Sequence, residues 1–245
     1  MASLEKTRGI VLNQIKYSDS QVIAQIYTEQ FGRQSFIFRK PKSKKTSISL
    51  NILQPFFLLD INAKFKGSRQ IQRAQEVNNN PHFKNIPFDI AKSSIAIFLA
   101  EILSKVLIEE ESNLALYSFL HHSILLLDEI EDGLANFHIF FLYELSKYLG
   151  FYPETNTLNS EKYFNIAEGS YSANSNNFKM VLNEQETKMF GLLSGKGFHQ
   201  INEIKLNRKQ RQTLLKILID YYRYHIPEMG RIKSYEILKQ IFADT

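Results

Sequence analysis

The sequence contains no cysteine. Disulfide bonds, thiolate-bound zinc and thiol catalysis are therefore excluded, and the composition fits a reducing compartment. Long apolar runs are also missing, because the most apolar stretch, residues 95–108, is interrupted by Glu101, Ser104 and Lys105. That stretch is too short to span a bilayer, and the N-terminus lacks the apolar segment of a signal peptide. We therefore expect a soluble, cytoplasmic protein with no membrane contact.

Motifs for catalysis or metal binding are also missing. Residues 195–197, Gly-Lys-Gly, lack the earlier glycine and the following Ser or Thr of a phosphate loop. The adjacent His121 and His122 would diverge by about 100° on a helix, so they do not suit one metal ion. The acidic run from Asp128 to Asp132 contains Asp128 and Glu129, which could hold Mg²⁺ in a nuclease. Acidic residues at the polar end of a helix are more often solvated. We therefore expect no enzyme, no metal and no cofactor, with the carboxylate-metal nuclease as a weaker alternative.

Acidic residues are scarce in the first third of the chain. Residues 1–80 hold 13 Lys and Arg against 5 Asp and Glu, whereas residues 81–152 hold 4 against 10. Residues 153–245 hold 13 against 10, and the whole chain has a formal net charge of +5. A regional excess of positive charge indicates an anionic partner for that region.

The basic character is densest between two predicted strands, where residues 39–45 read Arg-Lys-Pro-Lys-Ser-Lys-Lys. A charged connection tethered by strands is suited to polyphosphate, because each neutralised phosphate releases a counterion. A solvated loop that improves solubility is the alternative. The predicted DNA-binding residues are these cations and their neighbours on the strands: Arg33, Arg39, Lys40, Lys42, Lys44, Lys45, Lys64, Lys66 and Arg69.

Residues 1–77 alternate with a period of two and are rich in β-branched and aromatic residues, which is typical of strands. We expect strands at residues 8–16, 21–28, 34–38, 56–66 and 68–77. Five short strands favour a barrel, because a flat sheet would leave exposed edges. The five-stranded oligonucleotide/oligosaccharide-binding fold (OB-fold) fits this count.

After a linker at residues 78–82 the period changes to about 3.6, which indicates helices. Helices are predicted at residues 88–108, 112–131, 134–149, from 183, 208–225 and 234–242, with caps at Ser112, Asn183, Asn207 and Ser234. Residues 154–182 are weakly patterned, and we expect an irregular excursion with short strands. The predicted fold class is α+β with two domains, an OB-fold over residues 1–78 and a mostly helical domain over residues 79–245.

Six segments, in order and along nearly the whole chain, resemble the RecO family of DNA repair proteins. They are residues 9–12 (Gly-Ile-Val-Leu), 17–19 (Tyr-Ser-Asp), 27–32 (Tyr-Thr-Glu-Gln-Phe-Gly), 53–56 (Leu-Gln-Pro-Phe), 150–153 (Gly-Phe-Tyr-Pro) and 221–225 (Tyr-Tyr-Arg-Tyr-His) with Lys233-Ser234. The resemblance implies an N-terminal OB-fold, a C-terminal helical domain and no enzymatic activity. Many members carry four cysteines that bind zinc after the segment matching residues 150–153, and this chain has none there.

The resemblance also implies a function and partners. Such proteins bind single- and double-stranded DNA and anneal complementary strands. With RecR they help load the recombinase RecA onto strands coated by single-stranded DNA-binding protein. We therefore expect a cytoplasmic, nucleoid-associated recombination mediator with no small-molecule substrate, and an RNA-binding adaptor on the same barrel is the alternative.

A second basic cluster opens a predicted helix. A polar helix face is one interpretation, and an anion site for DNA or for the acidic C-terminal tail of single-stranded DNA-binding protein is the other. Its residues are Arg208, Lys209, Arg211, Lys216 and Arg223. Among the aromatic residues of the barrel, Tyr17 and Phe65 are the candidates for base stacking.

Overall fold

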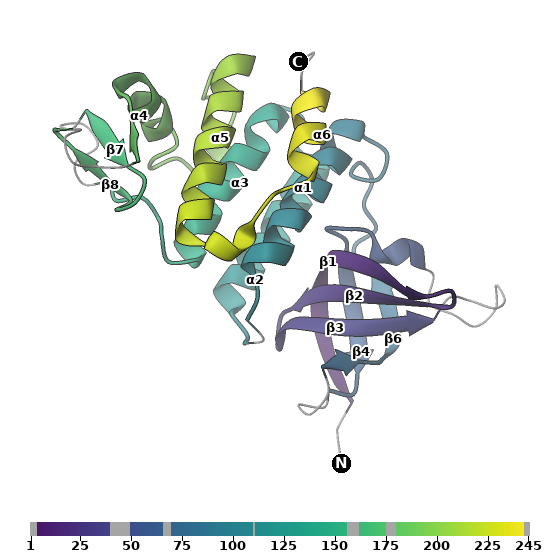
Figure 1. The fold of residues 1–245 in the computed structure, drawn as a ribbon. Helices are drawn as coiled ribbons and strands as arrows, with labels where there is room; N and C mark the ends of the chain where they lie inside the picture. Colours follow the sequence, from purple (N-terminus) through teal and green to yellow (C-terminus); the bar gives the residue numbers. More distant parts are fainter. Residues whose placement is uncertain are drawn as a thin grey trace. The chain divides into compact units, whose positions relative to one another are not determined.

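The computed structural model describes residues 4–39, 50–65, 70–109, 111–155, 162–174 and 180–242. The chain forms two compact units, Met1–Glu129 and Ile130–Thr245. A sheet and two helices make up the first unit, and the second is mainly helical (Figure 1). The α+β class is therefore confirmed. The predicted domain boundary after residue 78 falls where the sheet ends and stays a prediction.

The first unit contains six strands rather than the predicted five. They are β1 (Glu5–Ser18), β2 (Gln21–Thr28), β3 (Gly32–Arg39), β4 (Leu58–Ala63), β5 (Ile71–Gln72) and β6 (Ala74–Asn79), in the sheet order β5-β3-β2-β1-β4-β6. The last predicted strand is split at Arg73, so its first half pairs with β3 and its second half with β4. One continuous segment thus forms both edges of the sheet, which curls in the OB-like way (Figure 1).

The alternation read from the sequence places one face of these strands in a common core. Val22, Ala24 and Ile26 of β2 and Phe36 and Phe38 of β3 are all buried in it. Strand β4 begins at Leu58, two residues later than predicted, because the preceding Phe56 lies in the left-handed region with φ 71°.

Gly9 on β1 is required by close packing inside the barrel. A Cβ atom there would lie 2.6 Å from Cγ2 of Ile26 and 2.8 Å from Cδ1 of Ile61. Both distances are shorter than carbon atoms tolerate, so any side chain at position 9 would push β2 and β4 apart.

Two helices complete the first unit: α1 (Ile90–Val106) and α2 (Leu114–Glu129). Asp89 caps α1 by accepting hydrogen bonds from the backbone N–H groups of Ala91 and Lys92. The predicted cap of α2 was wrong by one residue. Asn113 accepts from the N–H of Leu116, whereas the hydroxyl of Ser112 donates to the carbonyl of Glu29.

The second unit is built on α3 (Leu134–Tyr148), α4 (Glu184–Gly191), α5 (Arg208–His225) and α6 (Ser234–Ile241). Asn183 and Asn207 cap α4 and α5 as predicted, and each forms a capping box with the residue three positions later. Ser234 was predicted to cap α6, but Lys233 occupies that position and Ser234 is the first helical residue. Among the described residues, single-turn 3₁₀ helices lie at Leu50–Leu53 in the first unit and at Phe198–Gln200 and Pro227–Met229 in the second.

The predicted excursion contains a small sheet in the order β8-β7-β9, formed by Tyr163–Asn165 (β7), Ser170–Ser172 (β8) and Val181–Leu182 (β9). Aromatic packing joins this region to α5. The ring of His225 stacks on Phe151 with centroids 4.9 Å apart, and its Nε2 atom lies 3.1 Å from the carbonyl oxygen of Ile166. The hydroxyl of Tyr221 donates to the carbonyl of Phe151. Ring packing and these hydrogen bonds therefore hold Phe151 and Ile166 to α5.

Tyr221→Phe is expected to destabilise the protein by about 1 kcal/mol, because the Phe151 carbonyl loses its donor in a part-buried position. Urea unfolding followed by circular dichroism measures the change. Tyr224→Phe is the matched control, because Tyr224 lies on the same helix but is 45% exposed. Equal stability of the two variants would contradict the role assigned to the Tyr221 hydroxyl.

Candidate nucleic-acid interface

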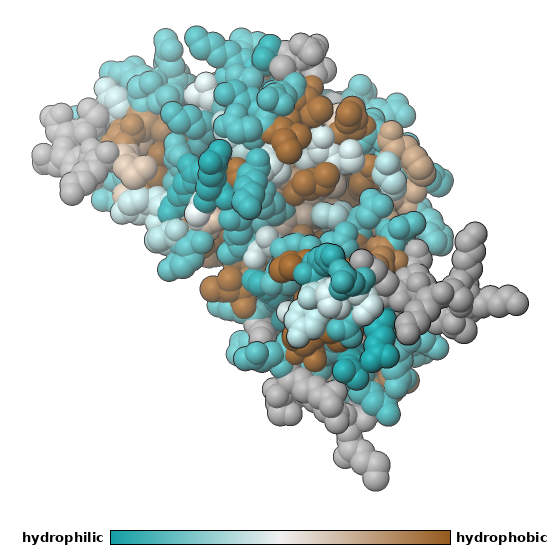
Figure 2. All heavy atoms as spheres, turned by 45° about the vertical axis from the view of Figure 1, so that its right-hand side comes forward, coloured by the Kyte–Doolittle hydropathy of each residue, from teal (hydrophilic) through white to brown (hydrophobic). Residues whose placement is uncertain are grey.

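Exposed apolar side chains occur at several places on the face shown in Figure 2, so exposure alone does not single out a site. One group of apolar side chains lies in register on neighbouring strands of the barrel. Ile15 of β1 pairs with Ile23 of β2, which pairs with Ile37 of β3. Ile23 and Ile37 alternate with buried residues, and the register places Ile15 in line with them, so the three form a row across the outer face of three strands, where Ile15 is 53% exposed. Tyr17, beside a register irregularity at the end of β1, is 61% exposed.

The basic segment begins beside this row. Arg39 is the exposed last residue of β3 and pairs with Gln21 at the start of β2. On the far side of the segment, Leu53 is fully buried in the barrel core, with Leu50 packed against it. Arg39 and Leu50, the described residues on either side of residues 40–49, therefore both belong to the barrel. Four of the predicted contacts, Lys40, Lys42, Lys44 and Lys45, lie outside the described residues.

The other predicted barrel cations do not gather beside Arg39. Lys64 is exposed but follows the end of β4 that pairs with Glu5, so it lies at the opposite end of β1. The guanidinium of Arg33 donates from Nη1 to the carbonyls of Ser104 and Leu107, both at 3.1 Å. Arg33 therefore binds the end of α1. Lys66 and Arg69 lie outside the described residues.

The two aromatic candidates also differ. Phe65 stacks on Phe31 with ring centroids 3.8 Å apart and meets Phe36 edge-on at 5.9 Å. It packs against the barrel core and is partly buried, and its contact with a base stays a prediction. Tyr17 is the aromatic ring that remains open to solvent beside the apolar row.

The basic residues of α5 separate into two groups. Lys209, Lys216 and Arg223 are spaced by seven and share one exposed face. Arg223 also contacts two nearby residues. Its Nη1 lies 3.5 Å from a carboxylate oxygen of Asp220, and its Nε donates a hydrogen bond to the carbonyl of Gly230. Arg208 and Arg211 instead line a narrow cleft.

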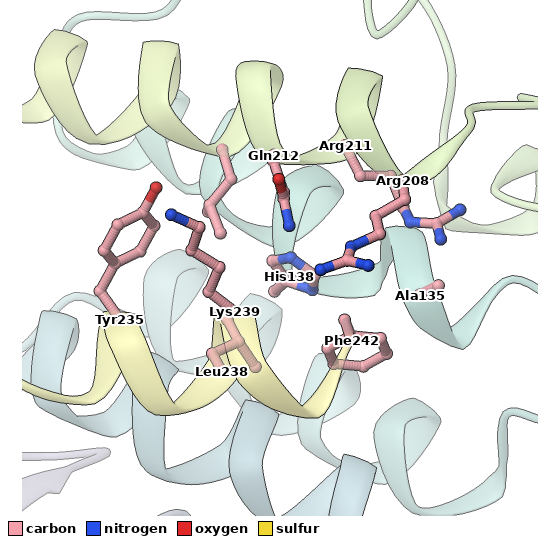
Figure 3. A pocket seen from close by; sticks show the side chains of 10 residues that line it. Ala135, His138, Arg208, Arg211, Gln212, Tyr235, Leu238, Lys239 and Phe242 are labelled. Carbon is pink, nitrogen blue, oxygen red and sulfur yellow. The ribbon is translucent and has the colours of Figure 1, made fainter. Parts of the chain in front are cut away.

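This cleft lies between α3, α5 and α6 and has a volume of about 20 Å³. In Figure 3, His138 lies between Gln212 of α5 and Leu238 of α6. Nη1 of Arg211 donates to the carbonyl oxygen of Leu206 at 2.7 Å. Leu215, Leu238 and Phe242 supply its apolar wall, and Lys239 adds a third cation. Burial, and then the charge of Arg211, lowers the pKa of His138 to about 3, so its ring is neutral at physiological pH. A basic rim around apolar side chains suits an acidic segment that carries apolar residues.

Asp128, one of the two acidic residues of the nuclease alternative, has a structural role. Asp128 is 7% exposed, and its carboxylate accepts hydrogen bonds from the backbone N–H groups of Lys84, Asn85 and Ile86 at 2.7–2.9 Å. The expectation that Asp128 is solvated was therefore wrong, and its carboxylate oxygens fasten a loop to α2. No group of three or more His, Cys, Asp or Glu residues suited to a metal ion occurs among the described residues.

Within the described ranges of the chain, no helix has the length and apolar character needed to cross a bilayer.

Comparisons with known proteins agree with the geometry. Residues 1–79 match the family model "Recombination protein O N terminal", and residues 87–236 match "Recombination protein O C terminal". A protein named DNA repair protein RecO from Bacteroides fragilis is 35% identical over 240 residues, covering 98% of this chain and 99% of the relative. Its namesake from Flavobacterium psychrophilum is 37% identical over 241 residues, covering 97% and 99%. The chain therefore belongs to the RecO family of DNA repair proteins, whose role lies in recombination and repair.

Proposed function

We propose that this protein is a recombination mediator that binds single- and double-stranded DNA and anneals complementary strands without covalent chemistry. With RecR it helps load RecA onto strands coated by single-stranded DNA-binding protein, at the nucleoid of the cytoplasm. The observation that carries the proposal is the run of five cations at residues 39–45, which follows strand β3 of an OB-like barrel in a chain of the RecO family.

The barrel supplies two kinds of contact to one strand. Arg39 and the lysines that follow it neutralise phosphates, which provides affinity without regard to sequence. Tyr17 and the row of Ile15, Ile23 and Ile37 lie beside Arg39 and offer apolar surface to unstacked bases. Two strands that are neutralised and held near each other repel less, so pairing proceeds faster.

An annealing assay tests this function. Complementary labelled strands are mixed with the protein, with no nucleotide and no metal, over a range of salt concentrations. The assay is repeated on strands coated by single-stranded DNA-binding protein. Annealing that is accelerated and falls with salt supports the proposal, and unaccelerated annealing contradicts it. Competition by RNA of equal length separates the proposal from the RNA-binding alternative.

The cleft of the second unit is our proposed site for the acidic C-terminal tail of single-stranded DNA-binding protein. The charges are complementary, because Arg208, Arg211 and Lys239 meet carboxylates. Leu215 and Leu238 offer apolar contact. Since the cleft holds only about 20 Å³, it must widen to admit an apolar side chain of the tail.

The double variant Arg208→Ala with Lys239→Ala is expected to bind the tail peptide about tenfold more weakly, because two charge-assisted contacts are lost. Fluorescence anisotropy with a labelled peptide measures the change. Lys188→Ala with Lys205→Ala removes the same charge from exposed positions outside the cleft and is expected to bind nearly as the parent does. An equal loss of peptide affinity in both double variants would show that the tail responds to the overall positive charge of the protein and does not bind in the cleft.

A further inference from the structure

A hollow of about 420 Å³ lies on the outer face of β1, β4 and β6, away from the apolar row on β1, β2 and β3. The register of the three strands brings the residues that line this hollow together. Arg8 pairs with Asp60, which pairs with Asn78, and Lys6 pairs with Asn62 in the neighbouring row. These side chains point outward because the alternate residues of β4, including Ile61, belong to the barrel core.

Arg8 is fixed at one side of this hollow. Its Nε and Nη2 atoms donate to the two carboxylate oxygens of Glu29 at 2.9 and 2.6 Å, and this bond lowers the pKa of Glu29. The guanidinium also lies over the ring of Tyr117, 5.5 Å from its centroid. Among the described residues nothing accepts a hydrogen bond from Nη1 of Arg8. The structure therefore presents a rigid planar donor with one unused nitrogen.

The facing side chains supply acceptors. One carboxylate oxygen of Asp60 accepts from Nδ2 of Asn80 at 2.6 Å, and the other has no partner within the described part of the chain. The amide of Asn62 donates to Glu76 and leaves its oxygen available. The formal charges of Lys6, Arg8, Glu29 and Asp60 cancel, so the hollow does not attract a polyanion. A flat, uncharged ring with both donors and acceptors fits this chemistry.

We propose that this hollow binds a base turned out of a single DNA strand, and that it favours guanine over thymine. This inference rests on the proposed function, because the base reaches the hollow only as part of a bound strand. The N1–H and N2–H groups of guanine donate to Asp60, while its O6 accepts from Nη1 of Arg8 on the adjacent strand. Thymine has one N–H between two carbonyls, and those oxygens would face the carboxylate.

The test compares two labelled oligonucleotides of equal length, one of thymines only and one with isolated guanines. Anisotropy titrations at fixed salt give the affinity ratio, which we expect to be about ten for the parent protein. Asp60→Asn is expected to bring the affinity ratio close to one, because the amide of Asn has one oxygen and can accept from only one of the two guanine donors. The salt dependence is expected to stay unchanged, since no phosphate contact is removed.

Asp19→Asn is the matched control. It changes the net charge equally at a fully exposed side chain, and we expect it to keep the ratio. Asp60→Asn retains an acceptor for Asn80, and thermal melting verifies its folding. A ratio near one in the parent protein, or a preserved ratio in Asp60→Asn, overturns the guanine site. Failure of the parent to bind either oligonucleotide would instead overturn the proposed function.

Discussion

Simultaneous charge reversal at Lys42, Lys44 and Lys45 is expected to weaken binding to single-stranded DNA about a hundredfold at low salt. If the basic segment neutralises about five phosphates, the slope of log affinity against log salt is about −3.5. Loss of three contacts leaves a slope of about −1.4, so the variant should also be less sensitive to salt. Anisotropy titrations at several salt concentrations measure both quantities.

Charge reversal at Lys84, Lys147 and Lys188 provides the control. These three lysines are exposed and lie outside the barrel, and their reversal changes the net charge of the protein by the same amount. The control should reduce affinity only slightly, and its salt slope should match that of the parent. Unchanged binding by the Lys42, Lys44 and Lys45 variant would show that the segment does not contact DNA. The solvated-loop interpretation would then hold.

Local pattern was sufficient to predict the barrel strands and most helices. Val22, Ala24 and Ile26 alternate with polar neighbours, and that alternation is enough to place them in a core. The capping boxes at Asn183 and Asn207 are also local, because each cap and its partner lie three residues apart. The break at Arg73 depends on which strands the residues on either side of it pair with, so no local pattern indicated a sixth strand.

The candidate site was less predictable, since its contacts join distant parts of the chain. Arg8 and Glu29 are separated by 21 residues, and no spacing rule links them. The division of the basic residues on α5 could have been anticipated from the seven-residue spacing of Lys209, Lys216 and Arg223. The role of Arg208 could not, because it depends on α6 packing beside α5.

Asp128→Ala is expected to destabilise the protein by about 3 kcal/mol at neutral pH. Three backbone N–H groups at residues 84–86 would lose a charged acceptor in a largely buried position. The carbonyl of Asp128, which accepts from Nζ of Lys92 at 2.7 Å, is part of the backbone and remains. Urea unfolding followed by circular dichroism measures the difference from the parent.

The same difference should depend on pH. Burial alone raises the pKa of Asp128, but the three N–H bonds and the charge of Lys92 together hold it below its ordinary value of 3.8. A carboxylate whose pKa is lowered in the folded state contributes its full stabilisation above about pH 4. That stabilisation is lost as the pH falls through the folded-state pKa. The parent and Asp128→Ala should therefore converge in acid. Glu129→Ala, a change at an exposed neighbour, should leave stability nearly unchanged.

Mg²⁺-dependent DNA cleavage by the parent that both variants lack would instead support the nuclease alternative, because that mechanism requires both carboxylates as metal ligands.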